Sequence, residues 1–215
     1  VITISRESYN DDVDAELNRA IDWLLGQGIH RVILTGDFHL ATQLVGADTL
    51  AFHPALSDER EGERISLAWS RTARRLHHDF RASVGFIHSK RCIGGMLELM
   101  MHCHQLVAVE DTLLAMPEVT IPVLPGMEGC HWPFRKADAE GRKKLLRLVL
   151  EGRPVKAADA SGWLVDHAGT LENAVRTAWQ VMEQDAEALK PRPFAGGPVE
   201  TPDAAEAGLA LVDGP

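Results

Sequence analysis

The stretch that most constrains this chain is Gly94-Gly95 followed by Met96-Leu97-Glu98-Leu99. Two glycines ahead of strong helix formers indicate a turn that opens a helix, because glycine gives the backbone freedom and lets a ligand approach it closely. The N–H groups of the first helical turn have no partner within the helix, so with the positive end of the helix dipole they can bind an anion. Glu98 lies within one turn of these groups. Backbone donors beside a carboxylate suit chemistry on a carbonyl group that passes through an enolate.

Composition excludes several classes of protein. A chain of 215 residues, 45% of them hydrophobic, can form one globular domain with a sizeable core. The 22 basic and 31 acidic residues give a net charge of -9, which argues against a nucleic-acid surface. No run of about 18 apolar residues predicts a membrane span, and no signal sequence is recognisable. Cys92, Cys103 and Cys130 do not form a secreted disulfide framework. We therefore expect a cytoplasmic protein with reduced thiols that binds neither nucleic acid nor membranes.

Apolar periodicity predicts the main elements. Val1–Ile4 and Arg31–Gly36 have the unbroken apolar character of strands, and a helical stripe over Asp14–Gly26 separates them. A strand, a helix and a second buried strand imply a right-handed crossover and a mainly parallel sheet, so the fold class is α/β. Further buried strands are expected over residues 82–88 and 105–109, and further helices over residues 65–79, 141–150 and 171–189. The chain has no initiator methionine and begins already apolar, so we expect some sequence to precede Val1.

Two more motifs follow the Gly94-Gly95 turn. The first is Met116-Pro117-Glu118-Val119, and the second is Leu124-Pro125-Gly126-Met127-Glu128-Gly129. In this order and at this spacing, the three motifs resemble those of the crotonase, or enoyl-CoA hydratase/isomerase, superfamily. The usual family pattern is Gly-Gly-Gly-x-Glu-Leu, then Pro-Glu-Val or Pro-Glu-Ile, then Pro-Gly-x-Gly-Gly, so Glu128 stands where a glycine is usual. The passage over residues 151–165, which contains Gly152-Arg153-Pro154, is also similar to the family.

The resemblance implies a domain organisation. It predicts a crotonase-like ββα spiral core over residues 1–140 and a C-terminal helical trimerisation region over residues 141–195. Residues 196–215 are small, acidic and rich in glycine and proline, so we expect a flexible tail or linker there. Residues 45–62 have no sustained period and are expected to form a loop or a short helix near the substrate entrance. A homotrimer or a hexamer is the assembly that the resemblance implies.

The resemblance also implies site residues. Glu98 and Glu118 would be the catalytic acids, and the N–H groups of Thr42 and Gly95 would form an oxyanion hole for the thioester oxygen. Thr42 is placed by matching residues 38–44 to a Phe-x-x-Gly-x-Asp-Leu pattern of the family, although these residues also fit an ordinary strand-to-loop connection. The further residues expected to contact the acyl-CoA substrate or its coenzyme A part are Phe38, Leu40, Gly94, Gly126, Lys190 and Phe194.

Neither a metal nor a cofactor is expected, apart from coenzyme A as part of the substrate. His102 and His104 would lie on different faces of a helix, and no zinc-binding spacing supports a metal site. Arg71, Arg74 and Arg75 fit either contacts to coenzyme A phosphates or a solvated helix face.

Two acids at these places favour addition of water across a 2-enoyl thioester, since one can activate water while the other protonates C2. The sequence therefore predicts an enoyl-CoA hydratase-like lyase. An isomerase, a thioester hydrolase, a carbon–carbon lyase and a catalytically silent crotonase-fold subunit or domain remain alternatives.

Overall fold

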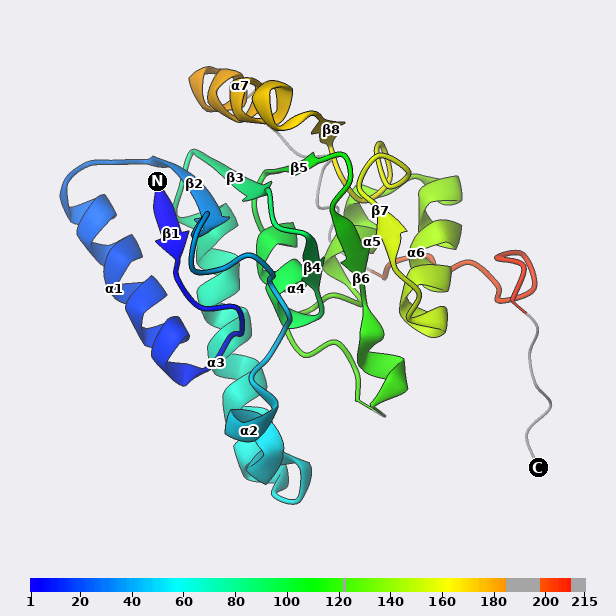
Figure 1. Ribbon diagram of the computed structural model, residues 1–215. Helices are drawn as coiled ribbons and strands as arrows, with labels where there is room; N and C mark the ends of the chain where they lie inside the picture. The colour runs from blue at the N-terminus through cyan, green and yellow to red at the C-terminus, as the bar shows by residue number, and fades with distance from the viewer. Residues whose placement is uncertain (122, 185–197, 210–215) are drawn as a thin grey trace.

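The computed structural model describes residues 1–121, 123–184 and 198–209, and its main feature is a five-stranded parallel sheet (Figure 1). All four neighbouring pairs of its strands are parallel, which confirms the predicted α/β class. The order across the sheet is β1 (Ile2–Ile4), β2 (Arg31–Gly36), β3 (Ala82–Ile87), β5 (Gln105–Val109) and β8 (His167–Gly169).

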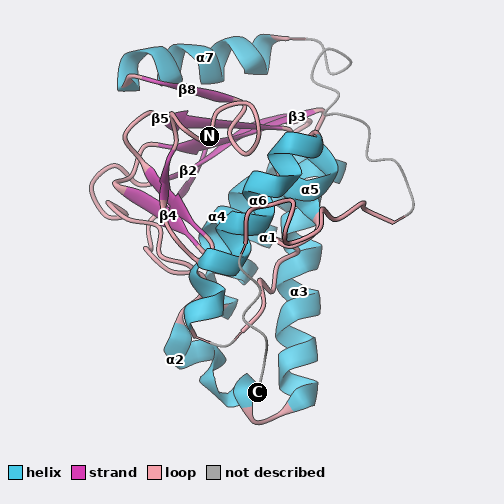
Figure 2. Cartoon of the chain, turned by 90° about the vertical axis from the view of Figure 1, so that its right-hand side faces the viewer, coloured by secondary structure: helices cyan, strands magenta, loops and turns pink. Residues whose placement is uncertain are grey.

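Helices cover both faces of this sheet (Figure 2). One face carries α7 (Leu171–Glu183), and α1 (Asp11–Gly26), α3 (Glu59–His78) and α4 (Gly95–Met101) lie on the other side. The other helices that the structure describes are α2 (Thr49–Phe52), η1 (His53–Leu56), η2 (Pro117–Thr120), α5 (Trp132–Lys136) and α6 (Ala139–Glu151). None of the helices among the described residues has the length and apolar character needed to cross a membrane.

The central strand β3 is buried on both faces, as its apolar run predicts. Its alternate residues Ala82, Val84 and Phe86 join the cluster that packs under α7, whereas Ile87 belongs to the larger core. Gly85 lies toward α4: a Cβ at this position would meet the backbone oxygen of Met100 at 2.9 Å. The absence of a side chain at Gly85 therefore lets α4 pack directly against the sheet.

A second sheet aligns the two turns that carry the predicted catalytic acids. It contains β4 (Arg91–Ile93), β6 (Leu113–Ala115) and β7 (Val155–Lys156), with β4 and β6 parallel. Ile93 pairs with Ala115, and the Gly94 N–H then donates to the Ala115 oxygen at 3.0 Å. Because α4 starts directly after β4 and η2 starts directly after β6, this pairing sets the two turns side by side.

Several helix boundaries differ from the sequence-based expectations. Helix α1 begins at Asp11, three residues earlier than predicted, and α3 begins at Glu59, six residues earlier. Side-chain caps from Asn10 and Asp58 support these polar first turns, which carry no apolar periodicity. The last helix ends at Glu183 rather than at residue 189, because Gln184 has an extended conformation with ψ of 154°.

Part of the segment expected to be a flexible tail packs against the rest of the chain. Val199 lies against the larger core cluster, and Glu200 is 3.6 Å from the Arg142 guanidinium. The domain boundaries at residues 140 and 195 remain predictions.

Replacing Gly85 by alanine should destabilise the chain, because the new methyl group would press on the backbone of α4. We expect a loss of about 1–3 kcal/mol in the free energy of unfolding, measured by denaturant titration. Gly26→Ala is a matched control, since a Cβ there would meet nothing within 4 Å. Equal stability of the Gly85→Ala variant and the wild type would contradict this account of the packing.

Candidate active site

Glu98 and Glu118 line one cavity of about 280 Å³. Glu98 comes from the first turn of α4, and Glu118 comes from η2. The rest of the wall is mostly apolar and comes from segment 45–47, helix α3, Ile121 and the segment 123–127. The apolar lining side chains include Phe52, Leu56, Ile65, Trp69, Ile121, Leu124 and Met127. Helices α2 and η1 also border this cavity, and they lie within residues 45–62, where a loop or a short helix was expected.

Two main-chain amides lie together at the wall of the cavity. A Cβ built on Gly95 would lie 3.4 Å from the Ala47 nitrogen, and a Cβ on Gly46 would lie 3.4 Å from the Gly95 nitrogen. Gly46 and Gly94 have positive φ values of 87° and 55°, a conformation that glycine adopts readily. Neither the Ala47 nor the Gly95 N–H donates a hydrogen bond to another described residue. Both N–H groups are therefore available to a ligand in the cavity.

The prediction that Thr42 is the partner of Gly95 is wrong. The Lys90 N–H donates to the Thr42 oxygen at 3.0 Å, and Leu44 pairs with Cys92, so the segment runs alongside β4. The position beside Gly95 lies five residues further along this segment than Thr42. The residue at that level is Ala47, which lies between the left-handed Gly46 and Asp48, the N-cap of α2. The signal for it in the sequence is Gly46-Ala47-Asp48, where a glycine precedes a helix cap.

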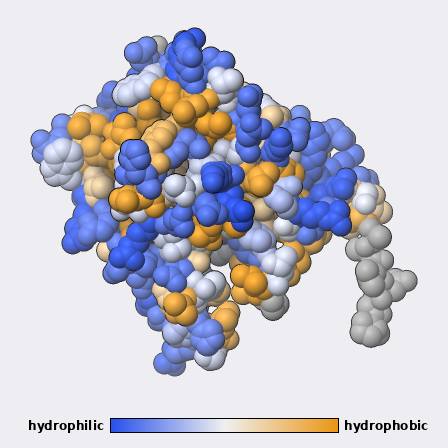
Figure 3. Space-filling view, viewed as in Figure 1, coloured by the Kyte–Doolittle hydropathy of each residue, from blue (hydrophilic) through white to orange (hydrophobic). Residues whose placement is uncertain are grey.

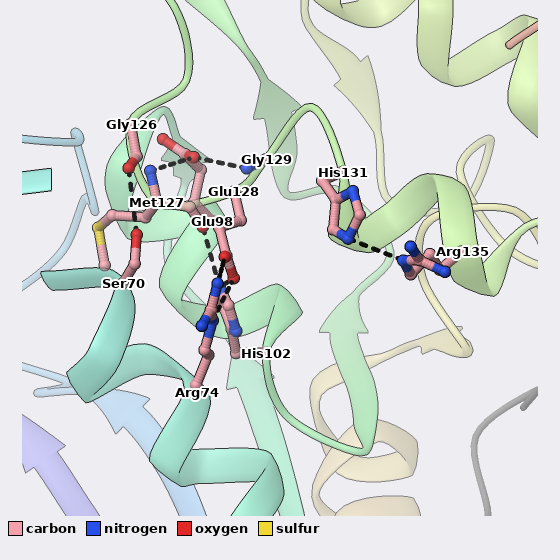
Figure 4. Close-up of polar contacts among 10 residues, drawn as sticks. All are labelled: Ser70, Arg74, Glu98, His102, Gly126, Met127, Glu128, Gly129, His131 and Arg135. Carbon is pink, nitrogen blue, oxygen red and sulfur yellow. Dashed lines mark hydrogen bonds and ion pairs between the residues drawn. The ribbon is translucent and has the colours of Figure 1, made fainter. Parts of the chain in front are cut away.

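Glu98 is almost fully buried, with 2% of its surface exposed. Its Oε2 accepts hydrogen bonds from the N–H groups of Met127 and Gly129, both at 2.8 Å (Figure 4). Burial, with a smaller contribution from the charge of Glu118, raises the pKa of Glu98 to about 8 even though these N–H groups act to lower it. Glu98 is therefore mainly protonated at neutral pH. Since Oε2 accepts two bonds, Oε1 is the oxygen that can carry the proton.

Glu118 is also buried, and burial raises its pKa above the ordinary value. Its Oε1 lies 2.9 Å from the position that a Cβ on Gly94 would occupy, so it faces the turn that opens α4. Its Oε2 is buried with no hydrogen-bond partner among the described residues. Because like charges in one apolar cavity repel, simultaneous ionisation of both acids is disfavoured.

The structure brings some of the other predicted contacts to the cavity and leaves others outside it. Gly94 and Gly126 line the cavity. Phe38 and Leu40 do not, because they follow β2 in an exposed turn, where Phe38 stacks on the His88 ring. On the face seen in Figure 3, hydrophobic residues gather below α7, over the parallel strands. Two predicted positions, Lys190 and Phe194, lie outside the described residues.

The histidines and arginines singled out in the sequence have contacts of their own. His102 Nε2 lies 2.9 Å from the Met127 oxygen, and His104 Nδ1 lies 2.9 Å from the Ser83 hydroxyl. Arg74 pairs with Glu128 (Figure 4), and Arg75 pairs with Asp22 and Asp79. These two arginines are thus occupied by intramolecular ion pairs, whereas Arg71 is exposed.

The raised pKa of Glu98 predicts a pH-dependent cost to stability. The pKa is higher in the folded chain than in the unfolded chain, so stability falls as pH rises from about 4.5 to 8 and then levels off. Glu98→Gln removes this cost. Its stability relative to wild type should therefore increase over that window by several kcal/mol, at roughly 1.4 kcal/mol per pKa unit, in denaturant titrations at each pH. Glu63→Gln, on the exposed surface of α3, is the control, and a flat difference for Glu98→Gln would contradict the assignment.

No family model matches the chain. Among curated proteins, the chain is 26% identical over 168 residues to a probable enoyl-CoA hydratase of Bacillus subtilis, covering 75% of this chain and 62% of the relative. It is 35% identical over 103 residues to the probable enoyl-CoA hydratase echA8 of Mycobacterium bovis, covering 46% of this chain and 39% of that protein. The chain therefore spans less than two thirds of the length of these relatives.

Solved structures give the same picture for the fold. The enoyl-CoA hydratase of Thermoplasma volcanium superposes with a TM-score of 0.71 at 20% identity, over 85% of this chain and 71% of that one. The three sequence motifs indicate the same superfamily as the relatives that match most of the chain. The shared fold agrees with both. The chain has the crotonase fold, and the probable enoyl-CoA hydratases to which most of its sequence is similar support the crotonase, or enoyl-CoA hydratase/isomerase, superfamily.

Proposed function

We propose that this protein is an enoyl-CoA hydratase-like lyase that adds water across the double bond of a 2-enoyl-CoA thioester. The observation that carries the proposal is the pair of buried acids in one cavity with two main-chain donors, Ala47 and Gly95. The names of the sequence relatives support an acyl-CoA substrate. The reaction needs no cofactor beyond the coenzyme A of the substrate, and the protomers assemble as a trimer or a hexamer.

The two amides stabilise the charge that develops during the reaction. The thioester oxygen accepts hydrogen bonds from the Ala47 and Gly95 N–H groups. When the water oxygen bonds to C3, the electron pair of the double bond moves through C2 toward the thioester oxygen and gives an enolate. Because the donors are fixed by the backbone and lie beside an apolar cavity, they stabilise the enolate more than they would in bulk water.

The two acids move the protons. Glu118 Oε2, which has no partner within the described chain, accepts the proton of the attacking water. Glu98, with its pKa raised by burial, donates the Oε1 proton to C2 as the enolate collapses. The product is a 3-hydroxyacyl thioester, with Glu118 protonated and Glu98 ionised. One proton passing from Glu118 to Glu98 through solvent restores the starting state.

Replacing either acid should strongly slow hydration. The absorbance of the conjugated thioester of crotonyl-CoA should fall when wild-type protein is added, and product mass should increase by one water. Glu118→Gln and Glu98→Gln should each lower the rate by about a hundredfold or more, since each removes a proton-transfer group. Glu63→Gln should retain the wild-type rate, because this residue lies on the exposed side of α3.

Other outcomes of the same assay distinguish the alternatives. Release of free coenzyme A thiol without hydration would contradict the proposal and indicate a thioester hydrolase. A shifted double bond would indicate an isomerase, and cleavage of the acyl skeleton a carbon–carbon lyase. Failure to bind any acyl-CoA would indicate a silent subunit.

The oxyanion hole makes a separate prediction that does not depend on turnover. Butyryl-CoA labelled with ¹³C at the thioester carbonyl should show a lower C=O stretching frequency when bound, because two N–H donors polarise the bond. Glu118→Gln should keep this shift, since the donors belong to the main chain. An unchanged frequency in the bound wild-type complex would contradict the role of Ala47 and Gly95.

A further inference from the structure

Residues 126–129 form a loop that holds Glu98, and we call this segment the Glu98 loop (Figure 4). Two of its N–H groups, from Met127 and Gly129, donate to the same carboxyl oxygen of Glu98. The loop is also packed tightly on this side chain, because a Cβ on Gly129 would lie 2.8 Å from Glu98 Oε2. The position of the Glu98 carboxyl therefore depends on the conformation of the loop.

The residue between these two donors has an unfavourable backbone conformation. Glu128 has a φ of 68°, and it is the one non-glycine residue with a positive φ among those that the structure describes. In this region the Cβ of an L-residue crowds the backbone, a penalty that glycine does not carry. Glu128 stands where the motif of the family usually has a glycine. A side chain at this position must therefore contribute something that offsets the strain.

The contact that Glu128 makes is an ion pair with Arg74 of α3. Arg74 Nε donates to Glu128 Oε2 at 3.0 Å, and Arg74 Nη2 donates to Oε1, so the pairing is bidentate. One helical turn earlier on α3, the Ser70 hydroxyl donates to the Gly126 oxygen at 3.3 Å. Helix α3 thus holds both ends of the turn that contains Met127.

A third contact comes from the end of α4. His102 Nε2 lies 2.9 Å from the Met127 oxygen, and a carbonyl oxygen can only accept, so Nε2 carries the hydrogen. The ring is fully buried, which favours its neutral form. His102 Nε2 also lies 3.8 Å from Glu128 Oε2, and the Glu128 backbone oxygen accepts hydrogen bonds from the N–H groups of His131 and Trp132 at 2.9 and 2.8 Å. To these contacts Arg74 adds the bidentate ion pair with the Glu128 side chain.

We propose that Arg74 and Glu128 are positioning residues: their ion pair locks the Glu98 loop in a strained conformation that holds the Glu98 carboxyl in place for proton transfer. The role of this ion pair in proton transfer rests on the proposed hydratase function, but its effect on the conformation of the Glu98 loop does not. Glycine at this position would need no lock, because it adopts the same φ without strain. The arginine and the glutamate therefore act together as a substitute for the usual glycine.

Hydrogen exchange of the Met127 and Gly129 amides, measured by NMR without substrate, tests the lock directly. In Arg74→Leu and in Glu128→Ala, we expect both amides to exchange about tenfold faster than in wild type, since the left-handed conformation then lacks the ion pair that offsets its strain. In Glu128→Gly the amides should exchange within about threefold of the wild-type rate, because the strain is gone. Adding Arg74→Leu to Glu128→Gly should have no further effect.

The variants are chosen so that loss of folding does not confuse the result. The Arg74 side chain is 51% exposed, so its replacement leaves no buried cavity. Arg64→Leu is the matched control on the same helix, because its ion pairs are with Asp11 and Glu61, away from the Glu98 loop. This control should leave the exchange of both amides unchanged.

The activity assay with crotonyl-CoA adds a second readout. Arg74→Leu should lower kcat by about tenfold with little change in KM, since Glu98 acts in the chemical step rather than in binding. The double variant Arg74→Leu with Glu128→Gly should have most of the wild-type kcat. Arg74→Lys should lose less activity than Arg74→Leu, because lysine keeps the charge but not the bidentate contact.

Two results would overturn the proposal. One is wild-type exchange of both amides in Arg74→Leu or Glu128→Ala. The other is fast exchange in Glu128→Gly, which would mean that the carboxylate, and not relief of strain, sets the loop. If wild-type protein does not hydrate crotonyl-CoA, the proposed function fails, whereas the exchange measurements still decide whether the ion pair locks the loop.

Discussion

The pairing of β4 with β6 is the constraint on which the rest of the site depends. These two short parallel strands end at the same level, and the Gly94 N–H extends the ladder by one bond to the Ala115 oxygen. Each strand is followed at once by a turn that carries one acid, so a single register places both Glu98 and Glu118 at one cavity. Segment 44–47 continues the same arrangement on the other side of β4 and brings the Ala47 amide to Gly95.

Most of the fold could be predicted from the sequence because its central strands are buried on both faces. Continuous apolar runs predict β2, β3 and β5 to within a residue, since almost every side chain in them is buried. The starts of α1 and α3 could not be predicted in this way. Their first turns are polar and rely on the caps Asn10 and Asp58, so they contribute nothing to the apolar stripe.

The candidate site was predictable where sequence position and spatial position coincide. Glu98 lies in the first turn after the Gly94-Gly95 pair, and Glu118 lies directly after Pro117, so their motifs place them locally. Ala47 was missed because its position depends on how far segment 38–47 runs beside β4, a long-range register that no local pattern records. The sequence does show the departure at Glu128, but its left-handed backbone and its partner Arg74 become visible only in three dimensions.

The two faces of the main sheet separate helix α7 from the cavity. Helix α7 packs on the cluster formed by the outward residues of β3 and β5, whereas the cavity and both acids lie with the larger core. The exposed Trp179 of α7 therefore lies across the sheet from both acids, and a probe placed there would report on this face of the molecule without touching the cavity.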